Sequence, residues 1–130
     1  MNVPANLLYT KDHEWLRVEG DFGYVGVTDF AQNQLSDIVF WEATVSVGDL
    51  VNSGTVLASL ESVKAAGEVL APVSGKVVSI NDNLADTPDL VNSDPYGKAW
   101  MIKIEMSKPE EVNSLMDAAA YQKNIEGRAH

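Results

Sequence analysis

The chain has 130 residues, of which 45% are hydrophobic and 22% are charged, proportions that are ordinary for one globular domain and argue against a disordered chain. The formal net charge of −10 disfavours nucleic acid and anionic membranes as partners, because both bind proteins that present basic surfaces. There are no cysteines, so the chain has no disulfide or thiolate chemistry of its own.

The two histidines, His13 and His130, lack the spacing of metal ligands, and we expect no metal site. No apolar run approaches the length that a bilayer-spanning helix requires. Residues 1–6 have the features of neither a signal peptide nor an Arg-rich transit peptide. We therefore expect a cytoplasmic bacterial protein, with the mature form of a mitochondrial protein as the alternative.

The N-terminal part of the chain predicts a β-hairpin followed by a short helix. Residues 13–18 and 22–27 are rich in β-branched and aromatic side chains, and a turn sequence at 19–21 separates them. Thr28 has the chemistry of a helix N-cap, which predicts a helix near 29–35.

The middle of the chain predicts many short strands. Residues 38–41 form a continuous apolar run, and between 44 and 80 short β-prone pieces alternate with glycines, of which Gly54 and Gly75 are interpreted as turn residues. Turns this frequent favour a small sandwich or barrel over a parallel sheet. A weak similarity between the segments on either side of residue 64 predicts two β halves joined at a hairpin tip.

The C-terminal part predicts an ordered loop, a strand and a helix. Residues 81–99 are polar with prolines and a glycine, and residues 100–104 alternate as a closing strand does. A capping-box sequence that begins at Ser107 predicts a helix near 108–120. The expected domain therefore spans 1–130, with a β core over about 7–105, a helical segment over about 107–122 and a flexible tail over 123–130. Within this tail, residues 125–128 match a protease recognition sequence used to cleave fusion proteins, and a native disordered tail is the alternative.

Lys64 is the residue whose surroundings indicate chemistry. It is one of seven lysines, but the small residues Ala65 and Ala66 follow it and leave open access for a modifying enzyme. A free lysine, with a pKa of about 10.4, is a poor nucleophile at neutral pH. Its acylation therefore needs a ligase and an activated acyl donor, and the amide formed removes the charge.

The sequence around Lys64 resembles the biotinyl/lipoyl domain superfamily, in which the modified lysine lies at the tip of a hairpin. Its turn differs from the Met-Lys-Met of biotin domains and the Asp-Lys-Ala of 2-oxo acid dehydrogenase lipoyl domains. It is similar to the turn of the H protein of the glycine cleavage system, and reads Glu61-Ser62-Val63-Lys64-Ala65. Further blocks of that family match at 9–15, 25–32, 37–40, 90–97 and 100–104. The resemblance covers about residues 7–122 and implies a mainly β fold, a barrel-sandwich hybrid of the lipoyl-domain type.

Three departures from the family pattern lie close to these blocks. Ser36 stands where the family has the glycine of Leu-Gly-Asp, and residues 42–47 lack a proline that the family has in this loop. After the lysine, residues 67–69 replace the common Ser-Asp-Val or Ser-Asp-Ile. None of the three changes the attachment motif itself.

The resemblance implies a carrier and not an enzyme, with (R)-lipoate attached covalently to Lys64. Glycine decarboxylase (P protein) would load the aminomethyl group of glycine, and the aminomethyltransferase (T protein) would pass it to tetrahydrofolate. Dihydrolipoamide dehydrogenase (L protein) would reoxidise the dithiol, and a lipoate ligase or octanoyltransferase would attach the group. The chemistry would belong to the cofactors, and the protein would supply position and shelter.

The resemblance also implies a resting cleft for the arm, lined by Asp12, Glu14 and Glu68. An aminomethyl thioether is labile in water, so a cleft would protect it, and its cationic amine would favour a carboxylate partner. For Asp12 and Glu68, an ordinary surface position is the alternative. Glu61 is expected to assist recognition by the ligase.

Three other functions stay open at the level of the sequence. A lipoyl or octanoyl relay protein, from which the acyl group passes to other enzymes, shares every motif above. A biotin carrier is disfavoured by the turn sequence. An unmodified β-rich interaction module would leave Lys64 without an acyl group.

Overall fold

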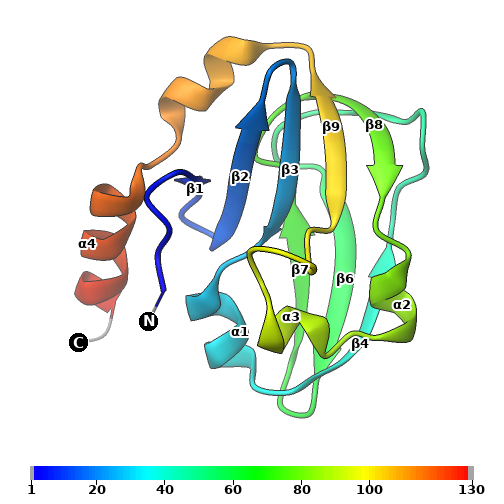
Figure 1. The fold of residues 1–130 in the computed structure, drawn as a ribbon, viewed down its shortest axis with the longest axis vertical. Coiled ribbons are helices and arrows are strands. Elements are labelled where there is room, and N and C mark those ends of the chain that lie inside the picture. The colour runs from blue at the N-terminus through cyan, green and yellow to red at the C-terminus, as the bar shows by residue number, and fades with distance from the viewer. Residues whose placement is uncertain (1, 129–130) are drawn as a thin grey trace.

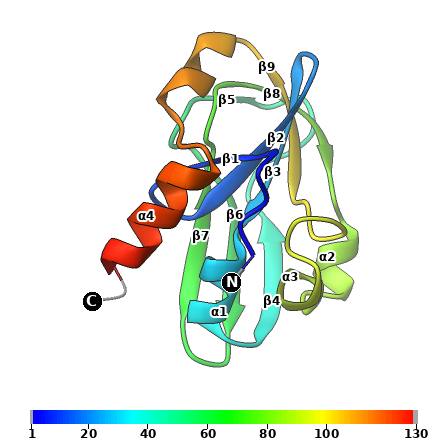
Figure 2. The same ribbon diagram turned by 60° about the vertical axis from the view of Figure 1, so that its left-hand side comes forward.

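The structure, a computed structural model, describes residues 2–128. Its two antiparallel sheets have the strand orders β1-β2-β3-β9-β8-β5 and β4-β6-β7. The strands are β1 (Leu8–Tyr9), β2 (Glu14–Glu19), β3 (Phe22–Val27), β4 (Ile38–Ala43), β5 (Leu50–Val51), β6 (Val56–Ser62), β7 (Ala66–Leu70), β8 (Gly75–Ile80) and β9 (Ile102–Met106). The helices are α1 (Asp29–Leu35), α2 (Asn83–Asp86), α3 (Leu90–Ser93), the 3-10 helix η1 (Pro109–Ser114) and α4 (Ala118–Arg128). Figures 1 and 2 show the two sheets facing each other, and the mainly β, barrel-sandwich fold class is confirmed.

The main core lies between the two sheets. Because successive side chains of a strand point to opposite faces, each strand supplies an alternating set of inward apolar residues. Leu57 and Leu60 of β6 and Ile104 of β9 are among the fully buried members.

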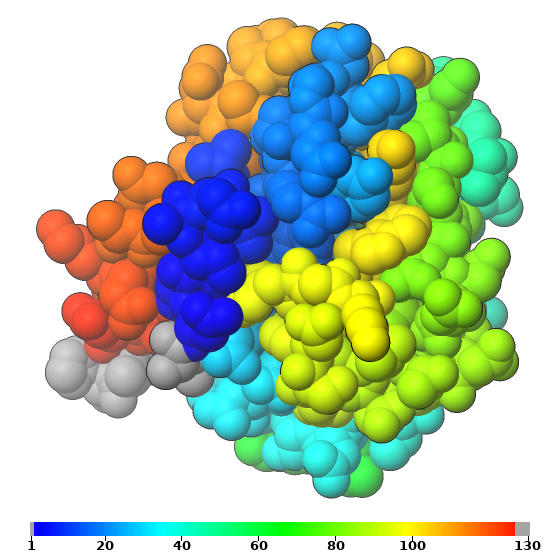
Figure 3. All heavy atoms as spheres, viewed as in Figure 1, coloured from blue at the N-terminus to red at the C-terminus, as the bar shows by residue number. Residues whose placement is uncertain are grey.

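A second, smaller core lies outside the larger sheet and holds α4 in place. The Tyr9 and Tyr121 rings stack with centroids 4.5 Å apart, and Trp15 and Ile125 are buried in the same cluster. Figure 3 shows the N-terminal segment lying against α4 on this side of the molecule. The N-terminal and C-terminal segments therefore complete one packed layer.

Several local predictions are confirmed. β2 and β3 pair as the predicted hairpin with Glu19 opposite Phe22. The predicted helix near 29–35 is α1, and the Thr28 hydroxyl accepts a hydrogen bond from the Ala31 N–H at 3.2 Å. The predicted closing strand is shifted by two residues, since β9 begins at Ile102. The predicted loop at 81–99 contains the one-turn helices α2 and α3.

The prediction of one helix over 108–120 is wrong. In place of the predicted Ser107 cap, η1 begins after Lys108 with no side-chain cap hydrogen bond, and it is a short 3-10 helix that ends at Ser114. The chain is then extended because Met116 exchanges two backbone hydrogen bonds with Tyr9, at 2.8 and 2.9 Å. A new helix starts after Asp117, whose carboxylate accepts from the Ala120 N–H at 2.8 Å, as a helix N-cap does.

The segment predicted as a flexible tail from residue 123 is helical as far as residue 128. α4 continues to Arg128, because Tyr121 and Ile125 are buried one turn apart on the same face of the helix. Residues 129–130, with His130, lie outside the described residues. No helix in the described part of the chain is long and apolar enough to cross a membrane.

Candidate functional site

Lys64 lies at the exposed tip of the β6–β7 hairpin. β6 ends at Ser62, β7 begins at Ala66, and the last paired residues are Glu61 and Ala66. Figures 1 and 2 show this hairpin projecting at the bottom end of the molecule. Lys64 is exposed and Val63 beside it is 70% exposed, so both are open to a second protein.

Ser62 shapes the turn that presents Lys64. Its backbone N–H donates to the Ala65 carbonyl at 2.7 Å. Its hydroxyl oxygen accepts from the N–H groups of Lys64 and Ala65, at 3.1 and 2.9 Å. A serine that satisfies backbone groups two and three residues ahead stabilises a tight turn. The turn therefore has a defined conformation although its side chains are exposed.

The hairpin tip rests on the end of α1 and the residues that follow it. The Val63 N–H donates to the Asp37 carbonyl at 3.0 Å, and the Lys64 Nζ lies 3.5 Å from the Gln34 carbonyl oxygen. The C-terminal end of α1 and the residues after it thus support the tip from one side, and the Lys64 amine lies close to this support.

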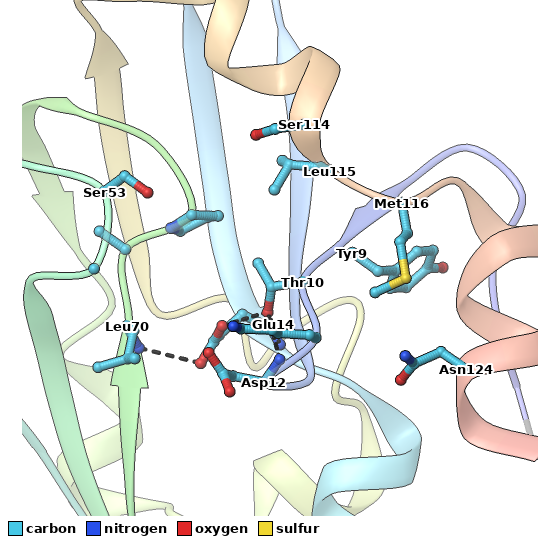
Figure 4. Close-up of a pocket in the computed structure, with 14 residues that line it drawn as sticks. Tyr9, Thr10, Asp12, Glu14, Ser53, Leu70, Ser114, Leu115, Met116 and Asn124 are labelled. Atoms are coloured by element: carbon cyan, nitrogen blue, oxygen red, sulfur yellow. Dashed lines mark hydrogen bonds between the residues drawn. The ribbon is translucent and has the colours of Figure 1, made fainter. Parts of the chain in front are cut away.

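A cavity of about 410 Å³ lies between the β1–β2 connection, the end of β7 and the C-terminal segment (Figure 4). Thr10, Asp12 and Glu14 line it from one side and Leu70 from another. Asn124 of α4 completes the wall opposite β7. The cavity brings together residues that are more than 100 positions apart in the chain.

Glu14 is a buried acid at the base of this cavity, with 2% of its surface exposed. Its carboxylate accepts from the Thr10 hydroxyl and from the Leu70 N–H, the latter at 3.2 Å. Burial raises the pKa of Glu14 above its ordinary value, and the negative charge of Asp12 adds to this, while the two hydrogen-bond donors oppose it. A buried carboxylate that takes up protons more readily than usual is typical of functional sites.

Asp12 lies next to Glu14 but faces solvent. Its side chain is exposed, and its backbone N–H donates to the Thr10 hydroxyl oxygen at 3.3 Å. The predicted residues Asp12 and Glu14 therefore line the same cavity, one at its mouth and one at its base.

Glu68 and Glu61 lie elsewhere, on the outer face of the three-stranded sheet. Both line a second hollow of about 370 Å³ together with Phe40. Glu68 is opposite Ser59 across the β6–β7 pair. The structure thus does not bring Glu68 into the cavity that Asp12 and Glu14 line.

Glu68 nevertheless lies on the face of β7 that runs from the tip to the cavity. Residues 66, 68 and 70 of β7 point to the same face, because the side-chain period of a strand is two. Ala66 is next to the tip, Leu70 lines the cavity, and Glu68 is midway between them. The four residue steps from Ala66 to Leu70 correspond to about 13 Å.

Asn124 is the functional candidate that the sequence did not indicate. Its Oδ1 atom is buried and has no hydrogen-bond partner among the described residues, and its side chain lines the cavity. An orphan buried acceptor is rare and costs free energy. No motif marks it, because its role depends on how α4 packs against β1.

The described residues contain no group of three or more His, Cys, Asp or Glu side chains that could hold a metal ion. His13 has a packing role, since its ring lies 4.6 Å from the Phe30 ring and its Nδ1 is 2.8 Å from the Tyr121 hydroxyl.

Comparisons with known proteins point to one family. Residues 7–128 match the family model described as "Glycine cleavage H-protein". The chain belongs to this H-protein family. It is 52% identical over 126 residues to a glycine cleavage system H protein of Cronobacter sakazakii, covering 96% of this chain and 97% of that one. It is 49% identical over 124 residues to that of Carboxydothermus hydrogenoformans, covering 95% of each chain.

A solved structure of an H-protein family member agrees with the fold. The glycine cleavage system H protein of Mycobacterium marinum superposes with a TM-score of 0.86 at 32% identity, covering 95% of this chain and 99% of that one. The H-protein resemblance inferred from the turn at Lys64 is therefore confirmed over almost the whole chain.

Proposed function

We propose that this chain is the lipoyl-carrying shuttle of a glycine cleavage system, with (R)-lipoate attached to Lys64. It would move the aminomethyl group of glycine from the decarboxylase to the aminomethyltransferase, as a carrier and not as an enzyme. The observation that carries this proposal is an exposed lysine on a supported hairpin tip, from which one face of β7 leads to an acidic cavity.

The residues present fit a lipoyl arm. A lysine side chain extended by a lipoyl group is about 15 Å long, at roughly 1.25 Å per bond along the chain, and the distance from Ala66 to Leu70 is about 13 Å. Small residues at 65–67 leave the start of this route open. The cavity at its end offers the Asn124 Oδ1, an acceptor without a hydrogen-bond partner among the described residues.

When attached, the lipoyl group would supply a dithiol that holds the one-carbon unit as an amine-bearing adduct. The chain's own residues would hold this cationic amine and keep water away. Asp12 at the cavity mouth would attract it, and Glu14 and the Asn124 amide oxygen would accept its protons in hydrogen bonds. Glu68 would meet the arm on its way along β7.

The partners follow from this role. We expect the P, T and L proteins to use the lipoyl arm, and a lipoate ligase or octanoyltransferase to attach it, with Glu61 contributing to recognition beside the tip. The net charge of −10 favours partners with basic docking surfaces. The similar proteins of Cronobacter sakazakii and Carboxydothermus hydrogenoformans support a bacterial source, and we propose a cytoplasmic setting.

Intact-mass measurement tests the attachment. Purified protein treated with lipoate, ATP and a lipoate ligase should gain the mass of one lipoyl group, and peptide mapping should place that group on Lys64. Lys64→Arg should gain nothing, whereas the matched variant Lys76→Arg, another exposed lysine, should be modified normally. An unmodified wild-type chain in the presence of a ligase that modifies a control substrate would contradict the carrier function.

Glycine-dependent exchange of bicarbonate tests the shuttle function. The lipoylated protein should support this exchange when mixed with a glycine decarboxylase, and the Lys64→Arg variant should not. A lipoylated protein that supports no exchange would instead indicate the lipoyl relay function.

A further inference from the structure

Ser36, directly after α1, has a backbone conformation that ordinary residues avoid. Its φ and ψ angles are 66° and −153°, in a region that only glycine adopts without strain. Among residues 2–128, His13 is the other non-glycine residue with a positive φ. A strained conformation of this kind persists only where surrounding contacts hold it.

The side chain of Asn92, in α3, supplies such contacts. Its Oδ1 accepts from the Ile38 N–H at 2.8 Å, and its Nδ2 donates to the Ser36 carbonyl at 2.9 Å. The same Nδ2 donates to the Gln32 side chain at 2.9 Å. One half-buried amide therefore holds the chain on both sides of residue 37 and connects it to α1.

Residue 37 is in turn the support of the hairpin tip. The Asp37 carbonyl accepts from the Val63 N–H at 3.0 Å, and Val63 immediately precedes the lysine. The hydrogen bonds thus form a continuous path from Asn92 through the segment 36–38 to the residue next to Lys64. Within residues 2–128, no hydrogen bond joins Asn92 directly to the hairpin.

We infer that Asn92 is a positioning residue for Lys64. Asn92 holds the segment 36–38 in a backbone conformation that is strained for a serine. It thereby keeps the Asp37 carbonyl within hydrogen-bonding distance of the Val63 N–H, and this contact orders the tip. A lipoate-attaching enzyme must place the Lys64 amine at an activated acyl group, and a pre-ordered tip lowers the entropy lost on docking. The expected effect on lipoate attachment rests on the proposed function of Lys64, whereas the ordering of the tip by Asn92 does not.

The test begins with Asn92→Ala. Lipoate incorporation by the ligase, followed by intact mass at low protein concentration, should slow by roughly tenfold. This is the change in rate expected when the tip loses a contact that contributes about as much free energy as one hydrogen bond. Hydrogen exchange of the Val63 N–H, measured by NMR on the unmodified protein, should become faster because its acceptor is no longer held.

A matched control separates positioning from general destabilisation. Asn81 is another amide whose Nδ2 donates to two backbone carbonyls, those of Lys98 at 2.8 Å and Trp100 at 2.7 Å. Asn81→Ala should lower the thermal midpoint at least as much as Asn92→Ala, but it should leave lipoylation kinetics and Val63 exchange at wild-type values.

A glycine at residue 36 should rescue the Asn92→Ala variant. In the double variant Asn92→Ala with Ser36→Gly, glycine adopts the conformation at residue 36 without strain, so most of the lost Val63 protection and lipoylation rate should return. If Asn92→Ala does not fold, Asn92→Asp retains the acceptor for Ile38, loses both donors and should show a smaller effect of the same kind.

Two outcomes would overturn the inference. One is that Asn92→Ala changes stability but leaves Val63 exchange and lipoylation unaltered, as the Asn81 control does. The other is that Ser36→Gly restores nothing. If the wild-type chain accepts no lipoyl group at all, the proposed function fails, whereas the exchange of Val63 still decides whether Asn92 orders the tip.

Discussion

The Glu14 carboxylate accepts a hydrogen bond from the Leu70 N–H at 3.2 Å, and this contact links the first residue of β2 in the larger sheet to the last residue of β7 in the smaller sheet. A buried acid thus connects the two sheets at the base of the cavity. Because the acceptor is ionisable, both the stability of this connection and the charge in the cavity depend on pH.

The stability of the folded protein should reflect the raised pKa of Glu14. The folded state holds the Glu14 proton more tightly than the unfolded state, whose pKa is 4.5. The contribution of this group is therefore greatest below pH 4.5 and is lost as the pH rises through the folded-state pKa.

Replacing Glu14 by Gln removes this ionisation. The unfolding free energy of the wild type minus that of Glu14→Gln should decrease as the pH rises from 4.5, and then level off. Urea unfolding at a series of pH values measures it. A difference that grows in favour of the wild type with pH would show that the folded-state pKa is lowered instead.

Ser62→Ala should affect the attachment of lipoate more than stability. The alanine can neither accept from the N–H groups of Lys64 and Ala65 nor donate to the Ala65 carbonyl, so the turn loses all three hydrogen bonds of the Ser62 hydroxyl. Because these groups are exposed to water, the loss in unfolding free energy should be about 1 kcal/mol or less. Lipoylation at low protein concentration should slow several-fold, as measured by intact mass, while Ser79→Ala in β8 should leave the rate unchanged.

Asn124→Leu should raise the stability of the fold but weaken the protection of the aminomethyl group from water. Leucine has a similar shape and removes an orphan buried acceptor, so the unfolding free energy should rise by about 1 kcal/mol. The cavity loses a polar partner for the charged arm, so the lipoylated, glycine-loaded protein should release formaldehyde in water faster than the wild type.

The control for Asn124 lies on the same helix. Gln122→Leu alters a side chain that contacts Glu126 and should not change formaldehyde release. Equal release from the wild type and Asn124→Leu would exclude Asn124 from the arm cleft.

Gly75→Ala should be far more destabilising than Gly54→Ala. A Cβ atom at Gly75 would lie 2.1 Å from the Glu105 carbonyl oxygen and 2.7 Å from the Ile104 Cγ2, so β8 and β9 would have to separate, at a cost of about 3 kcal/mol or more. Gly54 has a φ of 95° and open space around it, so alanine there costs only about 1 kcal/mol of backbone strain. Thermal unfolding of both variants measures the difference.

This contrast also corrects the interpretation of both glycines as turn residues. Gly54 does occupy a turn, and its positive φ explains the residue type. Gly75 is the first residue of β8, directly opposite Met106 of β9, and is required by the close approach of two backbones. A sequence shows that a glycine is present but not which of these two reasons applies.

The hairpin tip was predictable because its structure is local. Lys64, Ser62 and the small residues that follow lie within a few positions of one another, and the turn chemistry acts over that same range. The Thr28 cap of α1 and the β2–β3 hairpin are local in the same sense. For Glu14, in contrast, the sequence indicated a cleft carboxylate but not its burial, which depends on Leu70, 56 residues away.

The amino-acid sequence by itself determined the family, the candidate lysine at the hairpin tip and the alternation that makes this a mainly β protein, since each depends on residue types at short spacing. Only the tertiary structure decided the rest. It divided the predicted C-terminal helix in two, because Met116 pairs with Tyr9. It placed Asp12 and Glu14 in one cavity with Asn124, and Glu68 on the strand that leads to it. It also showed Asn92 holding the segment that supports the tip. These relationships join residues far apart in the chain, and the packing of one element on another determines them.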